Sequence, residues 1–442
     1  MLSLVPQLHS LVDGGASRTT TQLRQLGVEP AEHSVTVAVS VVSTSPARVL
    51  LAKTLIDMLL RLDPLVGRVI IATKGMDEEG LVSELSTNVP LSVEYGSWSN
   101  QYSIDIGEST GYHDLVVDGA GWMAALNETV NVNDDGNPIG ALATAALGAA
   151  EVFKAAFSLT YPDVASTLQF ENWNGSFSLF SYRYGGSSPA ISPISIDTTL
   201  VGVGGVGAGF LRAIAALGPL VTGFLKLVDA DVLNTHNLNR VSYATVEAAK
   251  AQKSKILEAE RWVREYCPNL IVNGFRETFN QYRSRLSPRR EDRRYDVMVT
   301  ALDKDEARWT AQRDLPRVLI DGSTGRDMVA RLERVEFGKY GCLGCTRRSL
   351  PSQIQGDCGS QPDERAPSLS FVSAYPGILA AGEVIKEALG LEGLRGQFDH
   401  VFRYGPNPDA KRIPAIRDDC MIQCSRSSKI EQYGRKYPVR TI

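Results

Sequence analysis

Length, composition and charge place the chain among folded proteins of more than one domain. It has 442 residues, of which 43% are hydrophobic and 22% charged, a composition that provides enough apolar surface for packed cores and argues against a largely disordered chain. Lys and Arg total 46 against 50 Asp and Glu, for a formal net charge of −4. Binding to nucleic acid or to an anionic membrane surface favours a basic excess, so neither partner is expected.

Targeting features point to a cytoplasmic protein. No apolar run approaches the about 20 residues that span a bilayer. The first residues lack a basic segment, and Pro6 interrupts their apolar stretch, so a secretory signal is not expected. Six cysteines in a long chain without such a signal argue against a disulfide framework and leave thiols for metal binding or chemistry.

The first part of the chain has a pattern typical of an α/β fold. The β-branched run 35–42 predicts a buried strand, and 46–62 has apolar residues at helical spacing behind a proline. Strands are predicted at 68–74 and 113–118, and an Ala-rich helix at 139–157.

A Gly-, Ser- and Pro-rich stretch at 184–193 predicts a boundary. After it the same order recurs, with strands predicted at 199–203, 224–228 and 295–302. The last of these resembles the strand at 113–118.

Late in each half comes a similar helix, with Glu151-Val-Phe-Lys154 in the first and Glu383-Val-Ile-Lys386 in the second. We therefore expect a duplication with two Rossmann-like units, residues 1–195 and 196–442, although any two apolar helices can look alike. Asp114 precedes Glu151 by 37 residues, whereas Asp296 precedes Glu383 by 87. The longer interval indicates that the second unit carries the chemistry.

A glycine-rich turn follows the strand at 199–203 and opens a helix. Its glycines are Gly202, Gly204, Gly205 and Gly207. Such a turn lets backbone N–H groups approach a phosphate at a helix N-terminus. Asp229 ends the next strand, where its carboxylate can accept hydrogen bonds from ribose hydroxyls. Alone, this pattern most often indicates a dinucleotide, so an NAD-dependent oxidoreductase is one hypothesis.

The residues after Asp229 favour a nucleoside triphosphate instead. Asp231, Asn237 and the cation Arg240 follow it closely, and Lys255 begins a helix that ends before Pro268. A triphosphate needs several cations, which Arg240 and Lys255 can supply. Asp303, which ends the strand at 295–302 and precedes Arg308, can hold Mg²⁺ through its carboxylate. Each charge alone is more often a solvated surface residue, and the set together predicts the site.

These motifs resemble the ubiquitin-activating-enzyme-like adenylyltransferases, the ThiF/MoeB/HesA superfamily, over about residues 196–425. The matching segments are GVGGVG at 202–207, DAD at 229–231, NLNR at 237–240, Lys255, and LDKDEAR at 302–308. The resemblance implies that ATP adenylates the C-terminal carboxylate of a ubiquitin-like protein, with release of pyrophosphate. It assigns the ribose to Asp229, the phosphates to Asn237, Arg240 and Lys255, and Mg²⁺ to Asp303. Lys304 and Val241 depart from the family, which usually has Asn and Gln there.

Two close cysteine pairs predict a metal site in the second unit. They are Cys342 with Cys345, and Cys420 with Cys424. Four thiolates suit a closed, structural Zn²⁺ site, and the resembled family has a structural zinc at corresponding places, usually with CxxC where this chain has a CxxxC second pair. Unliganded thiols on two loops are the alternative.

Cys358 lies in a polar segment before the helix that begins near Gly377, whereas Cys267 lies near a helix end. By the resemblance, Cys358 occupies the segment that crosses over the adenylate and accepts the acyl group as a thioester, which splits activation into two steps. An incidental loop cysteine is the alternative.

The resemblance implies that the first unit is an inactive partner joined to the active one, as in a fused pseudo-dimer. An arginine of this unit would reach the ATP, either Arg18, which fits the expected spacing better, or Arg24.

The sequence thus predicts an ATP-dependent activating enzyme for a ubiquitin-like protein that ends in glycine, with a conjugating enzyme accepting the thioester. The chain ends 18 residues past Cys424, which leaves no room for a further C-terminal domain. Enzymes of this shape resemble those of bacterial ubiquitin-like conjugation systems, some of which act in phage defence. A sulfur-carrier adenylyltransferase of cofactor biosynthesis and a non-catalytic nucleotide-binding scaffold remain alternatives.

Overall fold

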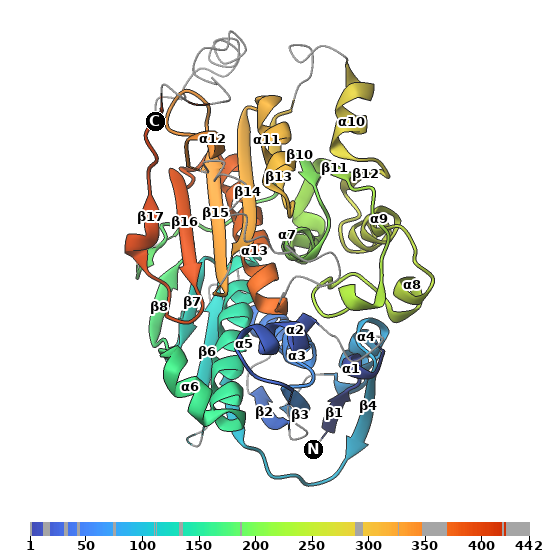
Figure 1. Cartoon of the computed structure of the whole chain (residues 1–442), viewed down its shortest axis with the longest axis vertical. Helices are drawn as coiled ribbons and strands as arrows, with labels where there is room; N and C mark the ends of the chain where they lie inside the picture. The colour runs from blue at the N-terminus through green and yellow to red at the C-terminus, as the bar shows by residue number, and fades with distance from the viewer. Residues whose placement is uncertain are drawn as a thin grey trace.

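Two β-sheets, one from each half of the chain, lie one above the other in the computed structural model (Figure 1). The structure describes residues 2–11, 18–30, 34–41, 45–73, 77–109, 111, 113–131, 136–185, 188–287, 295–325, 327–346, 369–417 and 420.

The first sheet has a parallel centre and antiparallel edges. Its described strands are β1 (Leu2–Pro6), β2 (Val35–Val41), β3 (Val66–Thr73), β4 (Leu91–Tyr95), β5 (Tyr102–Ile106), β6 (Leu115–Ala120), β7 (Met123–Leu126), β8 (Gly175–Ser178) and β9 (Arg183–Tyr184). They are ordered β4-β1-β3-β2-β5-β6-β7-β8-β9. Strands β3, β2, β5 and β6 pair in parallel, and the pairs on either side of them are antiparallel.

The second sheet repeats this plan. Its described strands are β10 (Ile194–Val201), β11 (Val221–Val228), β12 (Leu270–Phe275), β13 (Val297–Thr300), β14 (Val318–Gly325), β15 (Val329–Val335), β16 (Gly396–Val401) and β17 (Lys411–Arg412). The order is β12-β11-β10-β13-β14-β15-β16-β17, parallel from β12 to β14 and antiparallel beyond. The chain order reverses between β10 and β13, and open parallel sheets bind ligands at such a switch point.

The sheet order corrects one strand comparison made from the sequence. The strand predicted at 113–118 is β6, which turns back into an antiparallel strand just as β14 does. The counterpart of β13 is therefore β5, not β6, and the intervals counted from Asp114 and Asp296 do not start at matching strands. Short β-branched runs next to an aspartate look alike in sequence, and only their place in the sheet distinguishes them.

Helices fill the space between the sheets and cover their edges. The described α-helices are α1 (Leu8–Leu11), α2 (Arg18–Gln25), α3 (Pro46–Leu60), α4 (Glu78–Asn88), α5 (Ile139–Thr160), α6 (Pro162–Leu168), α7 (Gly205–Leu217), α8 (Val246–Lys250), α9 (Lys255–Tyr266), α10 (Phe279–Leu286), α11 (Asp305–Arg313), α12 (Leu343–Thr346) and α13 (Ser370–Ala388). Helices α3 and α5 pack together, α5 packs on α13, and α13 on α7. One continuous hydrophobic cluster therefore includes residues of both halves.

Local sequence explains where the interface helices begin and how closely they approach. Helix α3 starts at Pro46 behind the N-cap Ser45, whose hydroxyl accepts a hydrogen bond from the N–H of Arg48. Helices α7 and α13 pack closely where they cross, because the residue at the crossing is a glycine. A Cβ on Gly377 would lie 2.0 Å from the carbonyl oxygen of Val206.

Among the described helices, α5 is long and apolar enough to cross a membrane, and 94% of its apolar window is buried inside the protein. Burial of this kind is what the core helix of a two-sheet protein requires.

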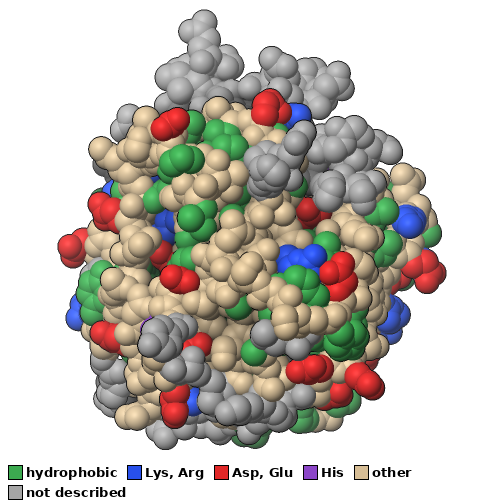
Figure 2. Space-filling model, turned by 90° about the horizontal axis from the view of Figure 1, so that it is seen from below, with side chains coloured by type: hydrophobic (Ala, Val, Ile, Leu, Met, Phe, Trp, Pro, Cys, Tyr) green, Lys and Arg blue, Asp and Glu red, His purple; other side chains and the backbone are tan. Residues whose placement is uncertain are grey.

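The face opposite the second sheet carries both acidic and basic side chains among its described residues, with hydrophobic ones scattered between them (Figure 2).

Candidate functional site

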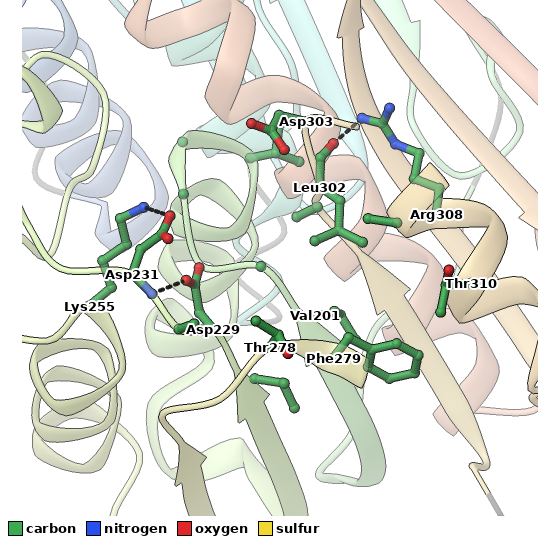
Figure 3. A pocket seen from close by; sticks show the side chains of 18 of the residues that line it. Val201, Asp229, Asp231, Lys255, Thr278, Phe279, Leu302, Asp303, Arg308 and Thr310 are labelled. Carbon is green, nitrogen blue, oxygen red and sulfur yellow. Dashed lines mark hydrogen bonds and ion pairs between the residues drawn. The ribbon is translucent and has the colours of Figure 1, made fainter. Parts of the chain in front are cut away.

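A cavity of about 440 Å³ opens at the switch point of the second sheet (Figure 3). The ends of three parallel strands form its floor, at Val201, Val228 and Ala301. The predicted residues that line it are Gly202, Gly204, Gly205, Asp229, Asp231, Arg240, Lys255 and Asp303. Residues far apart in the chain thus meet because the carboxyl ends of parallel strands share one edge.

The glycine-rich turn is tight where the backbone folds and open where it faces the cavity. Gly202 has φ +91°, and a Cβ there would lie 2.5 Å from the carbonyl oxygen of Ala301. A Cβ on Gly207 would lie 2.3 Å from the carbonyl oxygen of Gly202. By contrast, a Cβ on Gly204, the N-cap of α7, would meet no atom within 4 Å, and glycine offers no side chain to cap the helix. The first turn of α7 therefore presents amide groups suited to an anion.

Asp229 connects this turn to the end of β11. Its Oδ2 accepts a hydrogen bond from the N–H of Val203 and its Oδ1 accepts one from the N–H of Asp231, both at 2.9 Å. The hydroxyl of Tyr243 donates to the carbonyl oxygen of Val203 at 2.6 Å. Burial, together with the charges of Asp229 and Asp231, raises the pKa of Tyr243 well above its ordinary value, so this hydroxyl stays a donor and holds the turn in place.

The cations lie on the side of the cavity formed by α9 and the segment after β11. Lys255 begins α9, and its ammonium group pairs with Asp231 at 2.7 Å (Figure 3). Its side chain is 11% exposed, against 68% for Asp231. The stem of Arg240 lies against Gly205, and its guanidinium donates weakly to the carbonyl oxygen of His236 at 3.3 Å. Both cations therefore face the space in front of α7.

Asp303 stands on the opposite wall, just beyond β13 (Figure 3). The buried Arg308 of α11 donates to the carbonyl oxygen of Leu302 and contacts Asp321 at 3.2 Å. Arg308 thus orders the backbone immediately before Asp303. Lys304 is the N-cap of α11 and is not among the residues that line the cavity.

Two of the predicted nucleotide-binding residues lie outside the cavity lining. Gly207 packs within the turn, as its contact with Gly202 requires. Asn237 is buried and caps its own 3₁₀ turn, accepting a hydrogen bond from the N–H of Asn234 at 2.9 Å. Val241 is fully buried, so an apolar side chain suits that position.

Several lining residues were missed in the sequence. Glu277 and Thr278 come from the segment between β12 and α10, Phe279 and Asn280 begin α10, and Ser373 belongs to α13. The pattern of Thr278 followed three residues later by Gln281 forms a capping box, which a search for helix starts would have found. No comparable signal marks Ser373.

The thiols of Cys342, Cys345 and Cys420 form a buried cluster, with Cys342 Sγ lying 3.8 Å from Cys345 Sγ and 3.5 Å from Cys420 Sγ. All three sulfurs lie within 4.8 Å of one another. The buried Gln312 donates its side-chain amide to Cys342 Sγ at 3.4 Å, as outer groups do around metal-bound thiolates. The cluster can hold a metal ion, and thiolate ligands suit Zn²⁺.

The remaining predicted residues divide into described and undescribed ones. Cys358 and Cys424 lie outside the described residues. Cys267 is buried, and burial raises the pKa of its thiol to about 11, so it is a packing residue. Arg18 is the first residue of α2. Arg24 pairs with Glu29 at 2.9 Å on the surface.

The second half of the chain matches a known family model, and solved structures resemble parts of the chain. Residues 195–400 match the model of the ThiF family, and no curated protein matches the chain. Among solved structures, E. coli MccB with MccA-N7isoASN aligns at 17% identity and a TM-score of 0.40, over 52% of this chain and 66% of that chain. E. coli MccB with MccA aligns at 14% identity and a TM-score of 0.41, over 70% of this chain and 97% of that chain. PaaA aligns at 21% identity and a TM-score of 0.34, over 46% of this chain and 60% of that chain. The chain thus spans just under two thirds of the first solved chain. Residues 195–400, which contain the glycine-rich turn and the whole cavity, form a ThiF family domain.

Proposed function

We propose that the protein binds ATP in this cavity and adenylates the C-terminal carboxylate of a peptide or small carrier protein. One observation carries the proposal: a helix N-terminus, a carboxylate at the end of β11, two cations and a second carboxylate line the same cavity. Each of these groups matches one part of a metal–nucleotide complex.

Each of these groups would bind a different part of the nucleotide. Asp229 accepts two backbone hydrogen bonds, and a carboxylate has capacity left for ribose hydroxyls. Lys255 donates to Asp231 and retains two further N–H donors for phosphate oxygens. Arg240 adds a second cation in front of α7.

Asp303 fits a magnesium site because Mg²⁺ is usually bound by one or two carboxylates together with substrate phosphates. When bound, the ion neutralises phosphate charge. In the proposed reaction a carboxylate oxygen of the carrier attacks the α-phosphorus of ATP. The bond from that phosphorus to the oxygen bridging the α- and β-phosphates breaks, pyrophosphate leaves, and an acyl adenylate remains. Positioning and charge stabilisation by Arg240 and Lys255 supply the catalysis.

The finer proposal concerns the carrier and the first unit. We propose a ubiquitin-like protein ending in glycine, whose acyl group passes to Cys358. The thiolate attacks the acyl carbon, the bond to the adenylate oxygen breaks, and AMP leaves. A conjugating enzyme then accepts the thioester. The first unit would contribute Arg18, and its helix α2 is tied to α3 by a hydrogen bond from the Thr19 hydroxyl to the carbonyl oxygen of Arg61 at 3.1 Å.

The test is an intact-mass measurement under non-reducing conditions. The protein is incubated with Mg²⁺-ATP and a candidate carrier ending in a free glycine, beside Cys358→Ala and, as the matched control, Cys267→Ala. We expect an ATP-dependent, thiol-labile adduct on the wild type and Cys267→Ala alone.

Other outcomes separate the parts of the proposal. AMP and pyrophosphate without an adduct would support adenylation and exclude Cys358 as the acyl carrier. Intact ATP binding without pyrophosphate exchange, across a panel of peptide and ubiquitin-like carriers, would contradict the proposed activity and favour a non-catalytic scaffold.

A further inference from the structure

The last turn of α3, in the first half, holds a buried ion network that reaches into the second half. Asp57 lies 2.8 Å from the Arg61 guanidinium and 2.5 Å from that of Arg212, and Arg212 belongs to α7. Burial alone would raise the pKa of Asp57, but the charges and hydrogen bonds of the two arginines together hold it below its ordinary value. The network is therefore charged, and each arginine has a fixed partner.

Arg61 has a second partner in the turn that carries Arg240. Its guanidinium donates to the carbonyl oxygen of Leu238, and the Arg61 side chain is only 2% exposed. Leu238 lies within the turn that ends at Arg240, because the N–H of Arg240 donates to the carbonyl oxygen of Asn237 at 3.0 Å. Fixing the carbonyl of Leu238 therefore fixes the backbone that carries Arg240.

The same turn of α3 anchors two more segments. The last carbonyl groups of a helix lack partners within the helix. Here the carbonyl oxygen of Met58 accepts from the hydroxyl of Ser370 at 3.2 Å, and that of Arg61 accepts from Thr19 at 3.1 Å. Ser370 begins α13, the helix that brings Ser373 to the cavity. The end of α3 therefore contacts four segments: α2, α7, α13 and the Asn237–Arg240 turn.

We propose that Arg61 is a positioning residue for nucleotide binding: it holds the Asn237–Arg240 turn so that Arg240 faces the phosphates, and so makes the second half's nucleotide site depend on the first half. This inference rests on the proposed binding of ATP in the cavity. Adenosine lacks the phosphates that Arg240 contacts, so the loss of Arg61 weakens ATP binding and spares adenosine binding.

The test compares Arg61→Met with Arg48→Met by titration with ATP and with adenosine. Arg48 is the matched control, since it lies on α3 and forms a buried pair with Asp118 of the first sheet at 3.0 Å. Both variants lose a buried ion pair and we expect both to lower the melting temperature. Only Arg61→Met is expected to weaken ATP binding, by at least tenfold, with adenosine affinity within twofold of wild type.

Two further measurements distinguish positioning from general destabilisation. Amide hydrogen exchange across residues 237–241 should accelerate in Arg61→Met and not in Arg48→Met, with no nucleotide present. Adding Arg240→Met to Arg61→Met should cost less ATP affinity than Arg240→Met costs in the wild type, because the two residues act as a unit.

Equal loss of ATP and adenosine affinity, or additive effects of the two substitutions, would overturn the inference. ATP binding by the wild type without pyrophosphate release would contradict the proposed adenylation alone, because the titration measures binding only. A wild-type protein that binds neither ligand would overturn both proposals.

Discussion

At the scale of single residues, the glycines of the turn before α7 differ in what a side chain would meet. A Cβ on Gly207 would lie 2.3 Å from a backbone oxygen, whereas one on Gly204 would meet no atom within 4 Å and has an ordinary φ of −68°. One glycine is therefore required by the fold, and the other leaves space that a phosphate can occupy.

Alanine substitutions should separate these two roles. Gly207→Ala is expected to destabilise the protein by about 1–3 kcal/mol, the usual cost of overpacking. Gly204→Ala should cost less than about 1 kcal/mol and still weaken ATP binding at least tenfold, since its methyl group enters the cavity. Thermal melting and ATP titration measure both effects. Full ATP affinity in a stable Gly204→Ala variant would place the phosphates elsewhere.

Among the residues that line the cavity, the sequence predicted those that follow a strand, form the glycine-rich turn or begin a helix. Asp229 and Asp303 end β-branched runs, and Lys255 opens a helix, so each has a local signal. Arg61 has none, because its contact with Leu238 joins residues 177 positions apart. Ser373 is likewise brought to the cavity by helix packing alone. Contacts of this range depend on how the two halves dock, which one sequence does not encode locally.

At the scale of elements, continuous apolar runs predicted the parallel strands best. Strand β2 agrees with its predicted run, because strands buried on both faces are rich in β-branched residues. The short antiparallel strands, such as β9 with two residues, had no such pattern. Strand β10 begins at Ile194, earlier than predicted, since its alternating first residues are less apolar than its buried end.

The cysteine cluster joins α12 to a residue near the end of the described chain. Cys345 belongs to α12 and Cys342 directly precedes this helix. Cys420 follows Cys342 by 78 positions in the chain. Buried thiols this close to one another, supported by the amide of Gln312, suit a structural metal ion better than unliganded packing.

Metal analysis should test this arrangement directly. We expect about one Zn²⁺ per chain in the purified protein, retained in Cys267→Ala and lost in Cys345→Ser, because a structural site fails when a ligand is removed. A strong chelator should lower the melting temperature of the wild type towards that of Cys345→Ser. If the purified wild type contains no metal and the chelator does not change its melting temperature, the three thiols are packing residues without a metal.

At the scale of the whole molecule, the two halves share one core built on paired helices. Helices α5 and α13 pack against each other, and each carries a buried ion pair three residues apart. Lys154 lies 2.6 Å from Glu151, and Lys386 lies 2.6 Å from Glu383. The matching sequence motifs therefore occur on the two helices that pack together between the halves. We expect a core shared in this way to couple the unfolding of the two halves.

Removing one lysine of either pair should destabilise the whole protein in a single transition. Lys154→Met leaves the buried Glu151 without its lysine, a change that typically costs about 3–5 kcal/mol. Glu383 keeps Arg334 at 3.7 Å and the hydrogen bond from the Tyr182 hydroxyl, so Lys386→Met is expected to cost less. Lys53→Met is the matched surface control, since Lys53 and Glu84 are more than a third exposed, and exposed pairs contribute about 0–1 kcal/mol. Calorimetry should show one transition for all four proteins, lowered only in the two buried variants. The double variant Glu151→Gln/Lys154→Met should recover part of the loss of Lys154→Met, because no charge of that buried pair is then left without its partner. Two resolved transitions, with each substitution lowering only one of them, would mean that the halves fold independently and that the interface does not couple them.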